Sequence, residues 1–178
     1  MADMLVKLYD VRPDHELTER LAARGITIVR VLAPDRRRVV RFVETSTAEH
    51  WPDESADSWA SECEAALSNH PPSCFVAIRE RSIVGFACFD ATAKGYFGPT
   101  GVLREWQGMG VGTALLLASL LAMWEDGYGY AIVGWPAKQA MGFYERQVGA
   151  QLIEGSSPGI YRRLIDGGSS SSPRSSQS

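Results

Sequence analysis

Three glycines alternate in the segment 108–112 (GMGVG), between a strand-like run and a long apolar run, and this feature constrains the fold most. Residues 96–102 are predicted to form a strand. Residues 110–125 are predicted to form a helix that is apolar on nearly all sides and therefore buried. A second strand-like run follows at 130–135. Together these runs predict a strand–helix–strand unit with parallel strands and a right-handed crossover.

The glycine segment has the properties of an anion-binding turn. Glycine lacks a Cβ atom, so the backbone can come close to a ligand. The N–H groups of the turn and of the helix N-terminus can then bind a phosphate or a pyrophosphate. The dinucleotide fingerprint requires Gly or Ala where Thr113 or Leu115 stands, and the Gly-Lys-Ser/Thr of a P-loop does not occur. The spacing therefore disfavours a nucleotide-dependent oxidoreductase.

The remaining segments predict a mixed α/β layout around one central sheet. Strands are expected at residues 3–9, 26–32, 73–79, 83–90, 96–102, 130–135, 151–154 and 160–164, and helices at 15–24, 36–44, 58–67, 110–125 and 137–147. Asp35 is expected to cap the helix that follows it, and Pro136 is expected to stand in the first turn of the last helix.

Length and composition indicate a single globular domain in the cytoplasm. The chain has 178 residues, of which 45% are hydrophobic and 22% charged. The longest apolar run, 114–124, is shorter than the ~18–20 residues of a membrane span. The N-terminus lacks the basic and apolar regions of a signal peptide. The sequence has no CxxC pair, and its three cysteines, Cys63, Cys74 and Cys88, are interpreted as free thiols. Cys74 and Cys88 are expected to be small core residues.

Charge favours a small cationic partner over a nucleic acid. The net charge is −3, which argues against nucleic-acid binding. Seven acidic residues lie between 44 and 64, and neither Lys nor Arg occurs between Arg41 and Arg79. This run forms either solvated helix faces or a negative patch that attracts a cation. The three histidines are far apart in the sequence, so no metal site is expected.

The glycine segment resembles a known acetyl-CoA motif. The pattern Val102-x4-Gln107-x2-Gly110-x-Gly112 resembles the motif of the GCN5-related N-acetyltransferases (GNAT). The segment 140–146, with its Ala and Phe-Tyr, is similar to a later stretch of the same family. The order of the expected elements from about Ile26 to Ile165 agrees with that family as well.

This resemblance implies an α/β, GNAT-like fold. A mixed central sheet of about six to seven strands is flanked by about four helices, with a short N-terminal extension. Residues 1–25 would form this extension, packed on the core, and residues 26–166 the acetyltransferase domain. Residues 167–178 (GGSSSSPRSSQS) are expected to be a disordered tail. Because dimers are common in the family, a homodimer is left open.

The resemblance also assigns the cofactor contacts. The backbone amides of residues 107–113 would hold the pyrophosphate of coenzyme A, and the backbone of Val102 and Leu103 would bind the pantetheine arm like an added strand. By name the pyrophosphate residues are Gln107, Gly108, Met109, Gly110, Val111, Gly112 and Thr113. An N–H of Leu103 or Val102 would stabilise the oxyanion. Tyr144 matches the general acid, because a phenol with a pKa of about 10 is protonated at neutral pH.

The general base is not fixed by any motif. An attacking amine must lose a proton, and Glu62, Glu64, Asp90 and Glu105 are the candidates. By resemblance, the helix with Glu62 and Glu64 lines the acceptor side. Residues two apart do not share a helix face, so at most one of them points inward, and Glu62 is favoured. Asp90 ends a strand beside the glycine-bearing one and is the second choice.

These residues predict an acetyl-CoA-dependent N-acetyltransferase. The acetyl group would pass to a primary amine of a cationic small molecule by direct attack in a ternary complex, with no metal. The acceptor classes are a polyamine, an amino sugar, an amino-acid derivative or an amine antibiotic. A protein lysine or N-terminus is an alternative acceptor. A non-catalytic acyl-CoA-binding module is the alternative from another class.

Overall fold

The computed structural model describes residues 2–166, so the expected tail at 167–178 lies outside the described residues. The strands are β1 (Met4–Lys7), β2 (Ile26–Arg30), β3 (Cys74–Arg79), β4 (Ser82–Phe89), β5 (Tyr96–Val102), β6 (Tyr130–Val133) and β7 (Gln151–Leu152). The α-helices are α1 (His15–Ala22), α2 (Arg36–His50), α3 (Ala56–Leu67), α4 (Val111–Glu125) and α5 (Met141–Val148). Short 3₁₀ turns include η3 (Arg104–Trp106), η4 (Lys138–Ala140) and η5 (Gly159–Arg163).

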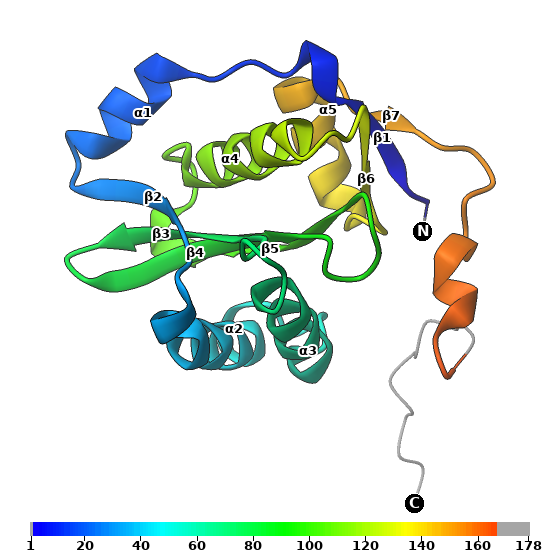
Figure 1. Cartoon of the computed structure of the whole chain (residues 1–178), viewed down its shortest axis with the longest axis horizontal. Coiled ribbons are helices and arrows are strands. Elements are labelled where there is room, and N and C mark those ends of the chain that lie inside the picture. The colour runs from blue at the N-terminus through cyan, green and yellow to red at the C-terminus, as the bar shows by residue number, and fades with distance from the viewer. Residues whose placement is uncertain (1, 167–178) are drawn as a thin grey trace, which may run out of the picture.

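The strands form one mixed sheet in the order β2-β3-β4-β5-β6-β1-β7. Only β5 and β6 pair in parallel, and all other neighbours are antiparallel. Helices α1 and α4 lie over one face of the sheet, and α2 and α3 lie over the other (Figure 1). This architecture confirms the predicted mixed α/β fold. No helix among residues 2–166 has the length and apolar character needed to cross a membrane.

Two layers of apolar side chains hold the helices on the sheet. On one face, α4 contributes Leu115, Leu116 and Leu120 to a core shared with β1, β4 and α1. On the other face, Val39 and Val43 of α2 pack on Val76 and Phe86. The uniform apolarity of α4 follows from its position between the sheet and α1. The burial predicted from the sequence for this helix is therefore confirmed.

The strand expected at residues 160–164 is wrong, because these residues form the turn η5. The place beside β6 is held by β1, which lies within the strand predicted at residues 3–9. Met4 and Val6 of β1 are both fully buried, as an inner strand requires, whereas Arg162 and Arg163 are exposed. Residues within the expected extension 1–25 thus form part of the central sheet.

Two helix boundaries also differ from expectation. Helix α2 runs to His50 rather than 44, and the hydroxyls of Thr45 and Thr47 within it donate to carbonyls one turn back. Asp35 precedes this helix but makes no side-chain cap, so that prediction is wrong. Helix α5 begins at Met141, after η4, so Pro136 is not in its first turn.

The parallel pair β5–β6 opens into a gap. Only Tyr96↔Ile132 and Phe97↔Val133 are paired, after which β6 ends while β5 continues to Val102. The register between β4 and β5 shifts in the same region, between Ala87 and Phe89. Bulges of this kind bend a strand and turn its groups away from its neighbour. The gap beside the second half of β5 is where the fold leaves backbone groups for a ligand.

Candidate functional site

The glycine loop presents backbone N–H groups at the start of α4. Gly108 and Gly110 have φ values of +73° and +91°, in the left-handed region that glycine adopts without strain. Ala114 makes the first bond of the helix, to the carbonyl of Gly110, and no side chain caps that residue. The amides of residues 111–113 therefore have no intrahelical acceptor. With no acid in the first turn, this end of the helix suits an anion.

The glycines of the loop have different neighbours. A Cβ on Gly110 would lie 2.5 Å from Leu17 Cδ1 of α1, so this position must be glycine for packing as well as for φ. A Cβ on Gly108 would meet nothing within 4 Å, so the loop is open on that side. The guanidinium of Arg20 lies 3.8 Å from the Gly110 position and adds positive charge beside the loop.

The end of β5 offers one free amide to the gap. The N–H of Leu103 donates to the Val84 carbonyl at 3.0 Å, so it is already used within the sheet. Because bonds alternate sides along an antiparallel strand, the amide of Val102 points away from β4 and toward the gap. The Val102 carbonyl accepts a 2.9 Å bond from Gln107 Nε2, which fastens the loop to the strand. Of the two predicted oxyanion donors, this leaves Val102.

Tyr144 of α5 packs against β5 at the residue where its pairing with β6 ends. Its ring packs edge-on against Phe97, the last paired residue of β5, with centroids 6.2 Å apart. The side chain is 7% exposed, and burial raises the pKa of its hydroxyl well above the usual range. The phenol therefore stays protonated at any physiological pH, as a proton donor must.

Glu62 lies on α3, on the face of the sheet opposite α4, where it contacts Thr92 of the turn between β4 and β5 and its charge acts on Tyr161. It is half-buried, whereas Glu64 is exposed, as the helix spacing predicts. Burial raises the pKa of Glu62, and a hydrogen bond from the Thr92 hydroxyl lowers it in part. Glu54 lies nearby at the surface, where partial desolvation and the carboxylates of Asp53 and Glu62 raise its pKa. A partly desolvated carboxylate with a raised pKa can accept a proton near neutral pH.

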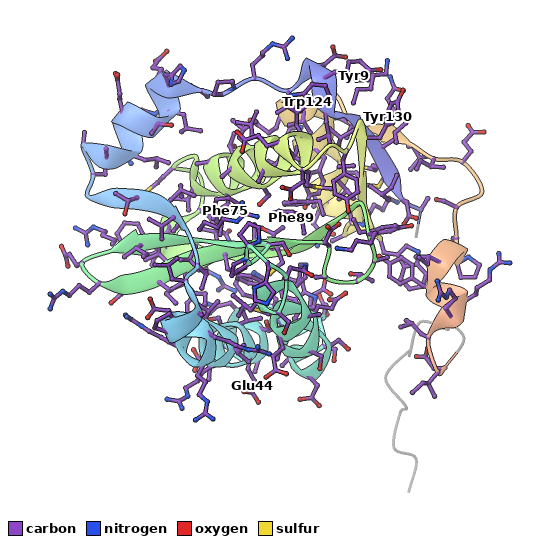
Figure 2. The ribbon with its side chains drawn as sticks, viewed as in Figure 1. Tyr9, Glu44, Phe75, Phe89, Trp124 and Tyr130 are labelled. Carbon is purple, nitrogen blue, oxygen red and sulfur yellow. The ribbon has the colours of Figure 1, made fainter. Side chains whose placement is uncertain are left out.

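Most of the acidic run does not join Glu62. Glu44 of α2 points away from the sheet into solvent (Figure 2). Glu49, Asp57 and Glu64 are likewise exposed. Glu54 is close enough to Glu62 for the Glu62 carboxylate to raise its pKa, and Asp53 is its neighbour in the chain. The run therefore consists largely of solvated helix faces, with a small group of carboxylates at the gap.

Asp90 is held in the turn between β4 and β5. Its Oδ1 accepts the Gly95 N–H at 2.7 Å, and its Oδ2 accepts the Tyr128 hydroxyl at 2.8 Å and contacts Lys94 Nζ at 3.2 Å. Asp90 itself has a φ of +52°. Both oxygens are thus committed to fixing this turn. The catalytic role predicted for Asp90 stays a prediction, and its contacts indicate a structural one.

The sequence analysis missed a group of side chains on the Glu62 side of the gap. Tyr161 of η5 stacks on Trp135 with centroids 4.0 Å apart and lies edge-on to Tyr96 at 6.4 Å. A side chain at Gly134 would collide with the Tyr161 hydroxyl. Burial, Asp3 and Glu62, in that order, raise the pKa of Tyr161. The C-terminal turn therefore covers the gap at the end of β6.

The buried carboxylate of Asp3 hydrogen-bonds to two residues of this aromatic group. Asp3 is 3% exposed and accepts the backbone N–H of Trp135 at 3.1 Å and the Tyr96 hydroxyl at 3.3 Å. Trp135 has a φ of +40°, a strained value that is most common at functional sites. Its indole Nε1 is buried and has no hydrogen-bond partner among the described residues. No spacing in the sequence relates residue 3 to residue 135, so pattern analysis could not have found the pair.

The three cysteines meet on the same face of the sheet. Their sulfur atoms lie within 4.8 Å of one another, although the residues come from α3, β3 and β4. Hydrogen bonds from Cys74 and Cys88 lower the pKa of Cys63 to about 5. Hydrogen bonding with Cys63, together with burial, raises the pKa values of the other two thiols. The thiols form a cluster rather than separate core positions.

Comparison with known proteins identifies one family. The profile of the acetyltransferase (GNAT) family matches residues 16–150. No curated protein sequence matches the chain. A GCN5-related N-acetyltransferase from Sphaerobacter thermophilus superposes with a TM-score of 0.62 at 22% identity, over 85% of this chain and 48% of that one.

Two further structures share the fold over more of their own length. A GNAT acetyltransferase from Brucella melitensis in complex with acetyl-CoA gives a TM-score of 0.53 at 18% identity, over 72% of this chain and 86% of that one. An aminoglycoside acetyltransferase from an uncultured soil metagenomic sample, in complex with trehalose, gives 0.52 at 22%, over 70% and 88%. At these identities the likeness concerns the fold.

Proposed function

Because the chain belongs to the GNAT acetyltransferase family, we propose that it transfers an acetyl group from acetyl-CoA to a primary amine of a cationic small molecule. One observation carries the proposal. The gap between β5 and β6 has backbone N–H donors on one face and a half-buried carboxylate on the other. An anionic cofactor and a cationic acceptor can therefore approach the same gap from opposite faces of the sheet.

The residues of the α4 face fit coenzyme A. The amides of residues 108–113 bind the pyrophosphate, where the open side of Gly108 lets a phosphate come close to the backbone. The predicted contact of the Gln107 amide is left out, because that amide donates to the Arg104 carbonyl. The free N–H of Val102 binds the pantetheine arm or the oxyanion of the tetrahedral intermediate. Leu103 is not assigned a contact here, since its amide is bound to the Val84 carbonyl and its carbonyl accepts the Trp106 N–H. No metal is needed for any of these contacts.

Proton transfers are assigned to the two faces. Glu62 accepts the proton of the attacking ammonium, directly or through a water, because its raised pKa keeps it a useful base near neutral pH. The neutral amine attacks the thioester carbonyl, and the C–S bond breaks as the intermediate collapses. Tyr144 donates a proton to the departing thiolate. The new amide nitrogen releases its second proton, which returns through water to the Tyr144 oxygen, so that the phenol is restored. Asp90 is not needed in this scheme, because both of its oxygens already bind the β4–β5 turn.

The acceptor is proposed to be a cation of modest size. Glu62, with Asp53 and Glu54 nearby, supplies negative charge, and Tyr96, Trp135 and Tyr161 supply aromatic faces. Tyr161 of η5 packs against Gly134 and Trp135 at the end of β6, and this side chain at the gap favours a small molecule over a protein surface. A polyamine, an amino sugar, an amino-acid derivative and an amine antibiotic all meet these conditions.

Thiol release from acetyl-CoA tests the proposal. The purified chain is assayed with small amines of these four classes, with a lysine-containing peptide and with a free peptide N-terminus. We expect release with at least one small cationic amine and none with the peptides. Thiol release with a peptide but with none of the small amines would show that the acceptor is a protein rather than a small molecule. Binding of acetyl-CoA without release for any amine would instead support the non-catalytic module.

A further inference from the structure

Three thiols converge in a region that the proposed reaction does not use. Cys63 comes from α3, Cys74 from β3 and Cys88 from β4, and all three are 0% exposed. Cys74 and Cys88 stand directly opposite each other in the antiparallel pair. Cys63 approaches them from the helix layer, and every sulfur lies within 4.8 Å of the other two. The arrangement is a triangle of soft donor atoms closed off from solvent.

The surroundings of the triangle determine which ion it can take. The buried neighbours are apolar, among them Val31, Val39 and Phe86. Among residues 2–166, these three sulfurs are the only group of three or more potential metal ligands, and the group contains no imidazole or carboxylate. Hard ions such as Mg²⁺ and Ca²⁺ require oxygen ligands and are excluded by this donor set. Structural Zn²⁺ takes four ligands, one more than the triangle offers.

The dimensions suit a three-coordinate ion. With metal–sulfur bonds of about 2.3 Å, a trigonal site places its sulfurs about 4.0 Å apart. Sulfurs within 4.8 Å of one another reach that spacing by shifts of well under 1 Å each. Rotation about the Cα–Cβ bonds supplies such shifts without movement of the strands.

We propose that Cys63, Cys74 and Cys88 form a trigonal binding site for a soft, thiophilic monovalent cation, with Cu(I) as the ion of that class. Each bond from Cu(I) to a thiolate replaces an S–H bond, and the proton leaves to solvent. The bound ion would tie α3 to β3 and β4 at the residue that follows Glu62. The site thus goes beyond the proposed acetyl transfer, and it would fix the helix that carries the proposed base.

Copper transfer from a chelator tests the site. The reduced full chain is mixed with the coloured Cu(I) complex of bicinchoninate, both in its native state and during refolding from urea, because the closed cluster must open to load. We expect one copper per chain, an ultraviolet thiolate-to-copper absorption, and a higher urea midpoint for the loaded chain. X-ray absorption of the wild-type complex should report three sulfur ligands and no oxygen or nitrogen.

Serine variants assign the ligands. Cys63→Ser, Cys74→Ser and Cys88→Ser should each weaken copper binding at least 100-fold. Ala66→Ser is the matched control, since it adds a buried hydroxyl to the same layer without removing a sulfur, and it should bind as the wild type does. The proposal is overturned if copper stays on the chelator by both routes. It is also overturned if X-ray absorption finds fewer than three sulfurs, or if Zn²⁺ binds more tightly than Cu(I).

Discussion

The two faces of the β5–β6 gap are built in different ways. On the α4 face, the proposed ligand groups are backbone amides of Val102 and of the nearby stretch 108–113. On the α3 face, the proposed ligand groups are the side chains of Glu62, Tyr96 and Tyr161, which come from separate segments and are joined there by the buried Asp3. A backbone site depends on conformation, which glycine spacing records directly in the sequence. A side-chain site depends on which segments the fold brings together, and the sequence does not record that locally.

The faces also differ in electrostatic character. The helix N-terminus and Arg20 offer positive partial and formal charge on one side. The other side offers the carboxylates of Glu62 and its neighbours beside aromatic rings. If the two faces act separately, substitutions on the α4 face should alter the affinity for coenzyme A. Substitutions on the α3 face should alter the KM for the amine or the rate of proton removal. The predictions below test this separation.

The largest effect is expected in the glycine loop. Gly108→Asp places a carboxylate on the open side of the loop, where the pyrophosphate is proposed to bind. Loss of two charge-assisted hydrogen bonds, at about 1.5–3 kcal/mol each, should weaken coenzyme A binding at least about 100-fold. Isothermal titration with coenzyme A measures it. Gly110 is unsuitable, because a side chain there meets Leu17 and disturbs the packing of α1.

Gly108→Asn is the matched control for that variant. Asn and Asp share shape and tolerance of the left-handed conformation, and both meet the same backbone at φ +73°. The difference between the two variants therefore isolates the charge. Equal coenzyme A affinities for Gly108→Asp and Gly108→Asn would show that no anion binds at this loop, and the α4 face would then not be the cofactor site.

The second effect concerns Glu62 on the other face. Glu62→Gln should lower kcat about 10²–10³-fold and leave coenzyme A affinity unchanged, since general bases contribute roughly 10²–10⁴-fold. Burial raises the pKa of Glu62 above the ordinary 4.5, so kcat/KM should rise with pH through that raised pKa. The variant should lose this acid limb. If kcat/KM of Glu62→Gln still rises with pH in the same range, that rise reports the titration of another group.

Thr92 allows the position of that limb to be tuned. The Thr92 hydroxyl donates to Glu62 and lowers its pKa, so Thr92→Val should move the acid limb to higher pH. Thr92→Ser keeps the hydroxyl and should leave the limb in place. Protonation of Glu62 favours the folded state, because its folded pKa exceeds the unfolded one. Stability should therefore fall as pH rises through this window, and Glu62→Gln should remove that dependence.

The sequence predicted the fold better than the acceptor side of the site. Alternating and helical patterns located nearly all elements, because β-branched runs such as 26–32 and the apolar run of α4 have no competing structure. The strand predicted at residues 3–9 was confirmed as β1, but its place beside β6 and the turn η5 at 160–164 were not predictable, since these segments are short and only tertiary pairing decides their structure. Tyr161 and Asp3 were missed for that reason. The thiol cluster was missed because cross-strand register is not visible in single-strand patterns.

A smaller kinetic effect is expected for Tyr144, which lies where the two faces meet. Tyr144→Phe keeps the ring contact with Phe97 and removes only the hydroxyl. A thiol has a reference pKa of about 8.5, so its thiolate leaves with modest help, and kcat should fall about 10- to 100-fold. The KM for acetyl-CoA should change less than kcat in steady-state assays. Wild-type turnover in this variant would make Tyr144 a packing residue only.

The smallest effect should come from Tyr161, and it tests whether η5 belongs to the acceptor side alone. Gly134→Ala adds a methyl group that collides with the Tyr161 hydroxyl, so it should displace the ring and raise the acceptor KM roughly 3- to 10-fold. Tyr161→Phe removes the colliding oxygen, so the same alanine should cost less in that background. Contact of the methyl group with Tyr96 Cδ1, at 2.9 Å, leaves a residual cost in both.

The double-mutant cycle for Gly134 and Tyr161 is measured with the amine that the thiol-release panel identifies, at saturating acetyl-CoA. A coupling between the two substitutions, with unchanged coenzyme A affinity, would confine η5 to the acceptor face. Additive effects would mean that the Tyr161 hydroxyl does not rest against Gly134 during turnover, so η5 would have moved away before the amine binds. A loss of coenzyme A affinity in the same variants would instead show that the two faces act as one site. Displacement of the Tyr161 side chain would then affect the backbone amides of the glycine loop on the other side of the gap.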